Sequence, residues 1–140
     1  MHRMLALIRT GQDFGPPPPN PQDSIVPSKF IEFETPFHFV ELEWIETADA
    51  THSQGNALYV SIGGGTPYVM LEGVIQQLDE EDLQVLPFTL EWELGRKLHR
   101  VTIDITVVPD DNMSVAIDGD SQQVLRLVAS AMPRITAFAN

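Results

Sequence analysis

Pairs of glutamates separated by one residue are the first feature of the sequence that could do chemistry. Glu41 and Glu43 form one pair, and Glu91 and Glu93 form another. Two carboxyl groups about 5–9.5 Å apart can serve as the acid and base of a glycosidase when an apolar pocket raises one pKa. No sequence feature marks such a pocket, and outward side chains of a half-buried strand are normally solvated. We therefore expect these glutamates to form a solvated or partner-facing surface.

The densest run of acids is Asp79-Glu80-Glu81-Asp82. Such a run is typical of a solvated loop or an exposed helix turn. The functional hypothesis is a docking patch for a basic partner, to which the glutamate pairs and Glu72 also contribute. The predicted partner-binding residues are Glu41, Glu43, Glu72, Asp79, Glu80, Glu81, Asp82, Glu91 and Glu93.

The metal-ligating residue types occur without a recognised spacing. The four histidines (His2, His38, His52 and His99) form neither His-x-His nor His-Glu-x-x-His, so a zinc site is not indicated. Four aspartates (Asp110, Asp111, Asp118 and Asp120) could gather around calcium, although they lack the Asp-x-Asp-x-Asp-Gly loop. Turns and helix caps explain these aspartates equally well. We predict no metal and no cofactor, with the calcium question left open.

Nucleotide and nucleophile motifs are also incomplete. Gly63-Gly64-Gly65-Thr66 could cradle a phosphate, but no lysine lies between Lys29 and Lys97, whereas a P-loop needs one directly after its glycines. A turn between two elements is the alternative that we favour. There is no Gly-x-Ser-x-Gly sequence for a serine nucleophile, and the absence of cysteine excludes thiol catalysis.

The negative charge is concentrated in the middle of the chain. The net charge is −12, and residues 29–95 carry thirteen acids against the single base Lys29. Such a block repels phosphates and anionic lipids and attracts basic partners. Nucleic-acid affinity comes mainly from Lys and Arg that neutralise phosphates. We therefore expect a basic protein partner and no direct contact with nucleic acid or membrane.

Length and composition indicate one domain. The chain has 140 residues, 43% of them hydrophobic, and no cysteine. The apolar run Met4–Ile8 is shorter than the 7–15 residues of a secretory signal, so we expect a soluble, cytoplasmic protein. We expect residues 29–140 to form the domain and residues 1–28 to form an apolar segment followed by a spacer.

The spacer contains most of the proline. Residues 11–28 hold six of the eleven prolines, which favours an extended linker, with a Pro-x-x-Pro ligand as the alternative. The apolar segment before it could fold back as an edge strand or a short helix. It could also exchange onto a neighbouring subunit, which would make a homo-oligomer through residues 1–28.

The hydrophobic rhythm predicts antiparallel strands at residues 30–34, 37–46 and 57–62. The clearest alternation covers residues 88–94 and 101–107, which predict a hairpin. A two-residue turn would place Glu91 opposite Arg100, and a four-residue turn would place Glu93 there. Met113, Val115 and Ile117 predict a third strand and therefore a meander over residues 88–118.

Two helices complete the predicted α+β fold. A helix at about residues 121–132 has Val124, Leu127, Val128, Ala131 and Met132 on one stripe and would cover the sheet. Residues 67–78 favour a second helix because Pro67 follows a threonine cap, although Tyr68 to Ile75 could equally be a buried strand.

Together these features predict a non-enzymatic, acidic protein-binding module. An inhibitor, an immunity-type protein or a nucleic-acid mimic would each use an acidic face to engage a basic partner. A structural subunit that uses the N-terminal arm is the first alternative. A small enzyme or ligand-binding domain is the second.

Overall fold

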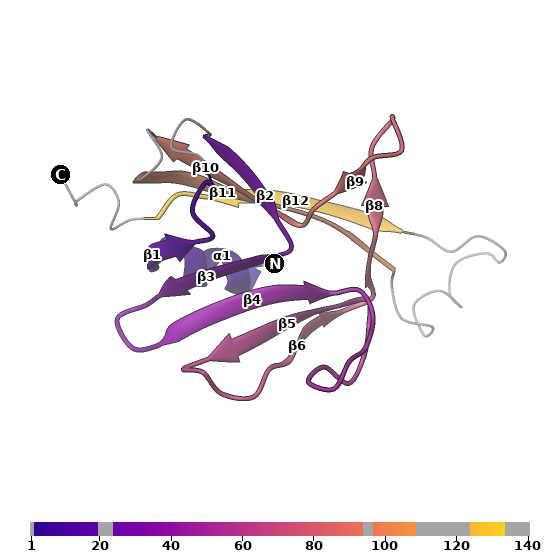
Figure 1. Ribbon diagram of the computed structural model, residues 1–140, viewed down its shortest axis with the longest axis horizontal. Helices are drawn as coiled ribbons and strands as arrows, with labels where there is room; N and C mark the ends of the chain where they lie inside the picture. The colour runs from indigo at the N-terminus through magenta and orange to yellow at the C-terminus, as the bar shows by residue number, and fades with distance from the viewer. Residues whose placement is uncertain (1, 20–23, 94–96, 109–123, 134–140) are drawn as a thin grey trace, which may run out of the picture.

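Two antiparallel β-sheets lie face to face in the computed structural model of the chain, which describes residues 2–19, 24–93, 97–108 and 124–133 (Figure 1). Sheet A has the order β1-β3-β4-β5-β6, and sheet B has the order β12-β11-β10-β2 with β7 also paired to β11. The strands of sheet A are β1 (Gln12–Gly15), β3 (Phe30–Glu34), β4 (Phe39–Ile45), β5 (Ala57–Ile62) and β6 (Tyr68–Glu72). Those of sheet B are β2 (Ile25–Ser28), β7 (Val74–Ile75), β10 (Phe88–Glu93), β11 (Lys97–Val107) and β12 (Leu125–Ala131).

A small hairpin and a helix complete the described structure. The hairpin consists of β8 (Gln77–Leu78) and β9 (Gln84–Val85), and it projects from the sheets in Figure 1. The helix is α1 (His2–Arg9). With eight residues, it is the only helix in the part of the chain that the structure describes, and it is too short to cross a membrane.

Alternating side chains build the core between the sheets. In β4, Val40, Leu42 and Trp44 are buried, whereas Glu41 and Glu43 point outward, as the sequence predicts. From sheet B, β10 and β11 contribute buried apolar side chains to the same core. The hairpin register is also settled, because Glu91 lies opposite Arg100, with a β-bulge between Glu91 and Trp92.

The predicted C-terminal helix is wrong, because Leu125–Ala131 forms strand β12. Leu127, Ala129 and Ala131 alternate with Arg126 and Val128, so this segment satisfies period two as well as a helical stripe. β11 offers an edge at Val101–Val107, and all seven residues of β12 pair with it. Backbone pairing along a complete strand therefore decides between two patterns that the side chains alone allow. The first part of the predicted helix, residues 121–123, lies outside the described residues.

The predicted helix at residues 67–78 is also wrong, because this segment forms β6, β7 and β8. Gly73 separates β6 from β7 with a φ of +74°, which a continuous helix does not contain. A Cβ atom at Gly73 would lie 2.5 Å from the carbonyl oxygen of Val108, so only glycine fits there. This turn transfers the chain from sheet A to sheet B. The structure is thus mostly antiparallel sheet and not an α+β domain with a covering helix.

The N-terminal segment takes the short-helix alternative. Met4 and Ile8 lie one helical turn apart and are completely buried in the core between the sheets. Arg3 donates a hydrogen bond from Nη2 to the hydroxyl of Tyr68 in β6 at 3.4 Å. The residues predicted as spacer contribute the edge strands β1 and β2. The predicted strand at residues 113–117 and the four candidate calcium-binding aspartates lie outside the described residues.

Candidate functional site on the outer face of sheet A

Four glutamates make the outer surface of sheet A acidic. We call Glu32 and Glu34 of β3 and Glu41 and Glu43 of β4 the acidic face. Glu32 and Glu41 are directly opposite in the antiparallel pair, and Glu43 follows Glu41 on the same side of the strand. Side chains that face each other in this way have Cβ atoms about 4.5–5.5 Å apart. The sheet thereby holds like charges close together.

Burial and neighbouring carboxylates raise the pKa of Glu41. Burial raises the pKa of the Glu41 carboxyl above its ordinary value, and the negative charges of Glu43 and Glu32 raise the pKa further. His52 acts in the opposite direction but more weakly. The charged form of Glu41 is therefore less favourable in the folded chain than in the unfolded chain.

Basic side chains do not neutralise this surface within the described residues. Lys29, the nearest lysine in sequence, lies 3.8 Å from Glu46 and 5.6 Å from the centre of the Trp44 ring. The arginine ion pairs of the described residues join Arg100 to Glu91 and Arg126 to Asp104, both in sheet B. Within ion-pair distance of the acidic face, the described residues place one basic group, His52 Nε2 at 3.7 Å from Glu43, and none beside Glu32, Glu34 or Glu41.

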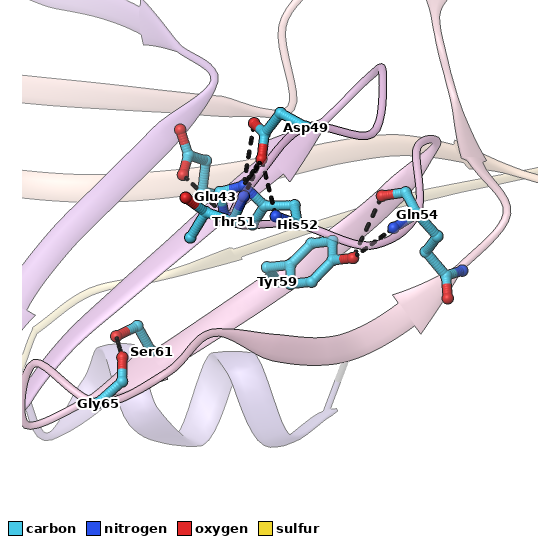
Figure 2. Close-up of polar contacts among 8 residues, drawn as sticks. All are labelled: Glu43, Asp49, Thr51, His52, Gln54, Tyr59, Ser61 and Gly65. Carbon is cyan, nitrogen blue, oxygen red and sulfur yellow. Dashed lines mark hydrogen bonds and ion pairs between the residues drawn. The ribbon is translucent and has the colours of Figure 1, made fainter.

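The loop between β4 and β5 folds over one end of the acidic face, and we call these residues, 46–56, the flap. Asp49 organises the flap, because its Oδ1 accepts hydrogen bonds from the backbone N–H groups of Thr51 (2.8 Å) and His52 (2.7 Å) (Figure 2). These bonds, together with the His52 side chain, lower the pKa of Asp49. At the base of the flap a Cβ atom on Gly55 would lie 2.6 Å from the Glu46 carbonyl oxygen.

His52 links the flap to the sheet. Its Nδ1 lies 3.0 Å from Asp49 Oδ1, and because an ionised carboxylate only accepts, Nδ1 carries the hydrogen. Nε2 points toward Glu43 at 3.7 Å, too far for a hydrogen bond. The imidazole also packs edge-on against Tyr59, with ring centres 4.7 Å apart. Figure 2 shows His52 held between Asp49 and Glu43.

A small apolar cluster explains why the flap closes on the sheet. Ile45, Ala57 and Tyr59 are buried on the outer side of sheet A, with Val69 packed against them. The Tyr59 hydroxyl donates to the carbonyl of Gln54 (3.2 Å) and accepts from its backbone N–H (3.0 Å). The flap thus buries apolar side chains of sheet A and provides hydrogen-bond partners for the hydroxyl group of the Tyr59 side chain.

The structure divides the nine predicted partner-binding residues among three places. Glu41 and Glu43 belong to the acidic face, and Glu72 lies on the same side of sheet A, opposite Ala57 in β5. The run from Asp79 to Asp82 forms the turn of the β8–β9 hairpin, where Asp79 Oδ1 accepts the backbone N–H groups of Glu81 and Leu83.

Glu91 and Glu93 lie on the outer face of sheet B, across the molecule from the acidic face. Each has a basic neighbour on β11, because Glu91 lies 3.7 Å from Arg100 and Glu93 lies 3.4 Å from His99. The two glutamate pairs predicted from the sequence therefore differ in their electrostatic surroundings.

Among the described residues, the glycine run lies in a turn and three of the histidines lie in different parts of the fold. Gly63–Gly65 form the turn between β5 and β6, so the strand that follows removes the helix a phosphate cradle would need. In the described residues, no group of three or more acids or histidines is arranged to hold a metal ion. His38 lies in the turn between β3 and β4, His52 in the flap and His99 in β11.

Sequence reasoning missed Glu32, Asp49, His52 and Tyr59 as members of one site. The signal for Glu32 was partial: Thr35-Pro36 marks a turn between the two strands, but only the observed four-residue turn Thr35–His38 places Glu32 opposite Glu41. Asp49 three residues before His52 also fits a side-chain-to-backbone turn. Nothing in the sequence indicates that the flap folds over Tyr59.

Comparisons of the chain with protein-family models, with characterised proteins and with solved structures find no match.

Proposed function

We propose that the chain is a non-enzymatic binding module whose acidic face engages a basic surface on a partner protein. The observation that carries the proposal is the Glu32–Glu41 pair, directly opposite in the sheet and without a lysine or arginine partner among the described residues. Like charges directly opposite each other destabilise a sheet, on the scale of cross-strand pair energies of roughly 0.2–1 kcal/mol. A cationic partner would relieve this repulsion. The free energy that the repulsion costs the free chain would therefore be regained on binding and would strengthen the complex.

The neighbours of these carboxylates favour arginine over lysine as the contacting residue. Phe39 lies on the same side of β4 as Glu41, is 41% exposed and faces Glu34 across the strand pair. A guanidinium group is planar, binds a carboxylate through two hydrogen bonds and stacks on aromatic rings. The acidic face offers both kinds of contact, because Phe39 and Glu41 lie two residues apart on the same side of β4.

The remaining predicted acids have a different part in this proposal. Asp79–Asp82 and the sheet B glutamates do not lie on the acidic face, so they contribute to long-range attraction and not to contact. A net charge of −12 exceeds the magnitude of about 2–8 that suffices for solubility. Complementary charge accelerates encounter at low salt and discriminates against wrong partners. Inhibitors, immunity proteins and nucleic-acid mimics share this mode of binding.

Affinity capture with two charge-matched variants tests the proposal. The wild-type domain is immobilised and exposed to a lysate of its native host, with washes at low and at high salt. The first variant combines Glu32→Gln, Glu41→Gln and Glu43→Gln. The second combines Glu80→Gln, Glu81→Gln and Asp82→Asn in the β8–β9 hairpin, so both variants lose the same formal charge.

We expect the wild type and the hairpin variant to retain the same basic protein, and the acidic-face variant to lose it. Equal losses in both variants would mean that total charge, and not the acidic face, governs binding. The absence of any specific basic protein at low salt would refute the proposed function.

A further inference from the structure

The turn between β3 and β4 presents an aromatic side chain to solvent at the end of the acidic face. Phe37 is 85% exposed, the largest exposure of any large hydrophobic side chain in the described residues. Phe39, the next outward-facing residue on β4, is 41% exposed. A single exposed apolar side chain is ordinary on a protein surface, so exposure alone does not distinguish Phe37. The backbone and the charges around Phe37 do.

The turn that carries Phe37 is held by several hydrogen bonds. Thr35 donates its N–H to the carbonyl of His38 at 2.7 Å, and its Oγ1 accepts the N–H groups of His38 (3.1 Å) and Phe37 (3.3 Å). Pro36 fixes its own φ within the same turn. Phe37 therefore projects from a preorganised backbone, and binding through it loses little conformational entropy.

Charge surrounds this aromatic tip on the side of the acidic face. Glu34 pairs with Phe39 immediately before the turn, and Glu41 follows Phe39 on the same side of β4. An apolar side chain at the centre and charged groups around it match the usual anatomy of a protein interface. The complementary surface is an apolar socket with arginines at its rim.

We propose that Phe37 is the anchor by which the domain docks into an apolar socket of its partner, with arginines beside the socket meeting Glu34 and Glu41. This inference rests on the proposed function, since it names the partner surface that the acidic face would engage. The two contributions have different kinetic signatures. Surface charges mainly set the association rate and its salt dependence, whereas a desolvated aromatic anchor mainly sets the dissociation rate.

The test measures binding kinetics against the host protein that the wild-type domain retains, identified and purified from the capture experiment. Phe37→Ala is compared with Leu83→Ala. Leu83 is 59% exposed in the β8–β9 turn, so the control removes an exposed apolar side chain remote from the acidic face. Both variants should keep the wild-type unfolding midpoint, because neither side chain is in the core.

We expect Phe37→Ala to accelerate dissociation about 30-fold or more with an unchanged salt dependence of association. Leu83→Ala should match the wild type. The triple acidic-face variant should instead slow association and flatten its salt dependence.

A fluorescence measurement locates Phe37 in the complex. Trp44 and Trp92 are only 3% and 7% exposed, so acrylamide should quench them weakly. The Phe37→Trp variant should add a readily quenched indole in the free protein, and partner binding should protect this indole.

Three outcomes would overturn the inference. If Phe37→Ala dissociates like the wild type while the acidic-face variant loses association, Phe37 is not the anchor and the proposed function remains. If sedimentation shows a dimer of the wild type that Phe37→Ala abolishes, the occupant is a second copy of the chain. If no host protein is retained at all, the proposed function fails first and the anchor fails with it.

Discussion

Glu41 is the residue at which stability and the proposed function conflict. Its carboxylate is partly buried, and this burial is the main reason that its pKa is raised; the charges of Glu43 beside it and of Glu32 across the sheet raise the pKa further. A group whose folded-state pKa is raised favours folding when protonated, and this contribution is lost as the pH rises through the folded-state pKa. At neutral pH the charged Glu41 therefore weakens the fold.

Glu41→Gln should stabilise the free domain at pH 7 by up to about 1 kcal/mol, because the substitution removes a carboxylate directly opposite another. The gain should shrink toward zero below pH 4.5, the ordinary value for Glu41, where the wild-type side chain is neutral too. Chemical denaturation at both pH values measures the difference. Glu34→Gln is the control, since Glu34 faces Phe39. A destabilised Glu41→Gln variant at pH 7 would contradict the electrostatic argument.

Asp49→Ala should loosen the flap. The substitution removes the acceptor of two backbone N–H groups and of the His52 ring, and nothing else in the flap replaces that acceptor among the described contacts. Amide exchange at Thr51 and His52 should accelerate about ten-fold. Asp79→Ala removes the corresponding acceptor from the β8–β9 turn and should leave exchange in the flap unchanged. Unaltered exchange in the Asp49 variant would show that the remaining contacts of the flap, including the Tyr59–Gln54 hydrogen bonds, are sufficient to hold it.

At the scale of elements, the passage from β6 to β7 depends on one glycine. Gly73→Ala should lower the free energy of unfolding by at least about 2 kcal/mol, because alanine at positive φ is strained and its Cβ would meet the Val108 carbonyl. Gly64→Ala is the matched control. Its φ is also positive, at +73°, but no atom lies within 4 Å of the added Cβ, so a cost of about 1 kcal/mol is expected. Equal losses would contradict the close contact with Val108.

A polar network joins β8, β11 and β12 on the outer side of sheet B. Asp104 of β11 accepts two hydrogen bonds from Arg126 of β12, at 3.0 and 2.8 Å, and one from Gln77 of β8 at 3.1 Å. The contact with Arg126 is the main reason that the pKa of Asp104 is lowered. A lowered carboxyl pKa contributes stability above the ordinary value, and this stability is lost as the pH falls through the folded-state pKa.

Asp104→Asn should therefore cost about 1 kcal/mol at pH 7, a modest amount because the Arg126 side is exposed to solvent. The difference from the wild type should disappear in strong acid, below the lowered pKa of Asp104. Denaturant unfolding at pH 7 and at low pH measures both values. Glu91→Gln is the control, since its 3.7 Å contact with Arg100 is longer and should contribute less. A loss that persists in acid would indicate a packing effect.

For the whole molecule, the two outer faces differ in how their charges are compensated. On sheet B, Glu91, Glu93 and Asp104 each lie near arginine or histidine, whereas on the acidic face of sheet A only Glu43 has a basic neighbour in the described ranges, His52 at 3.7 Å. The proposed binding surface thus lies on one side of the sandwich. Of its carboxylates, Glu32, Glu34 and Glu41 would meet a basic partner without first breaking an ion pair among the described residues, whereas Glu43 would exchange its contact with His52.

Helix α1 completes the core of the same molecule, and Ile8 tests this role. Ile8→Ala should destabilise the domain by about 2–5 kcal/mol, because the side chain is fully buried between the sheets. Arg9→Ala, at an exposed position one residue later, should change stability by less than about 0.5 kcal/mol. Thermal and denaturant unfolding give the comparison. A negligible effect of Ile8→Ala would place α1 outside the core. The exchange of residues 1–28 between subunits stays a prediction.

The sequence by itself determined the elements whose patterns are local. Aromatic and β-branched content predicted β3 and β4, and strict alternation predicted the β10–β11 hairpin, because a strand with one buried face must alternate. The strand β5 was also predicted, although four of its six residues are buried in succession. The same alternation correctly placed Glu41 and Glu43 outward and Trp44 inward. The position of the acidic block also followed from residue counts alone.

The tertiary structure decided whatever depended on a distant partner. Leu125–Ala131 fits both a helix and a strand, and the edge of β11 selected the strand. Because the chain passes from sheet A to sheet B at Gly73, the segment predicted as a helix at residues 67–78 forms three short strands. Glu43 and Glu91 both stand in the sequence Leu-Glu-Trp. Strand order nevertheless places them on opposite outer faces of the molecule. Periodicity records which face of an element is buried, but the neighbour of each element is set by contacts between residues far apart in the chain.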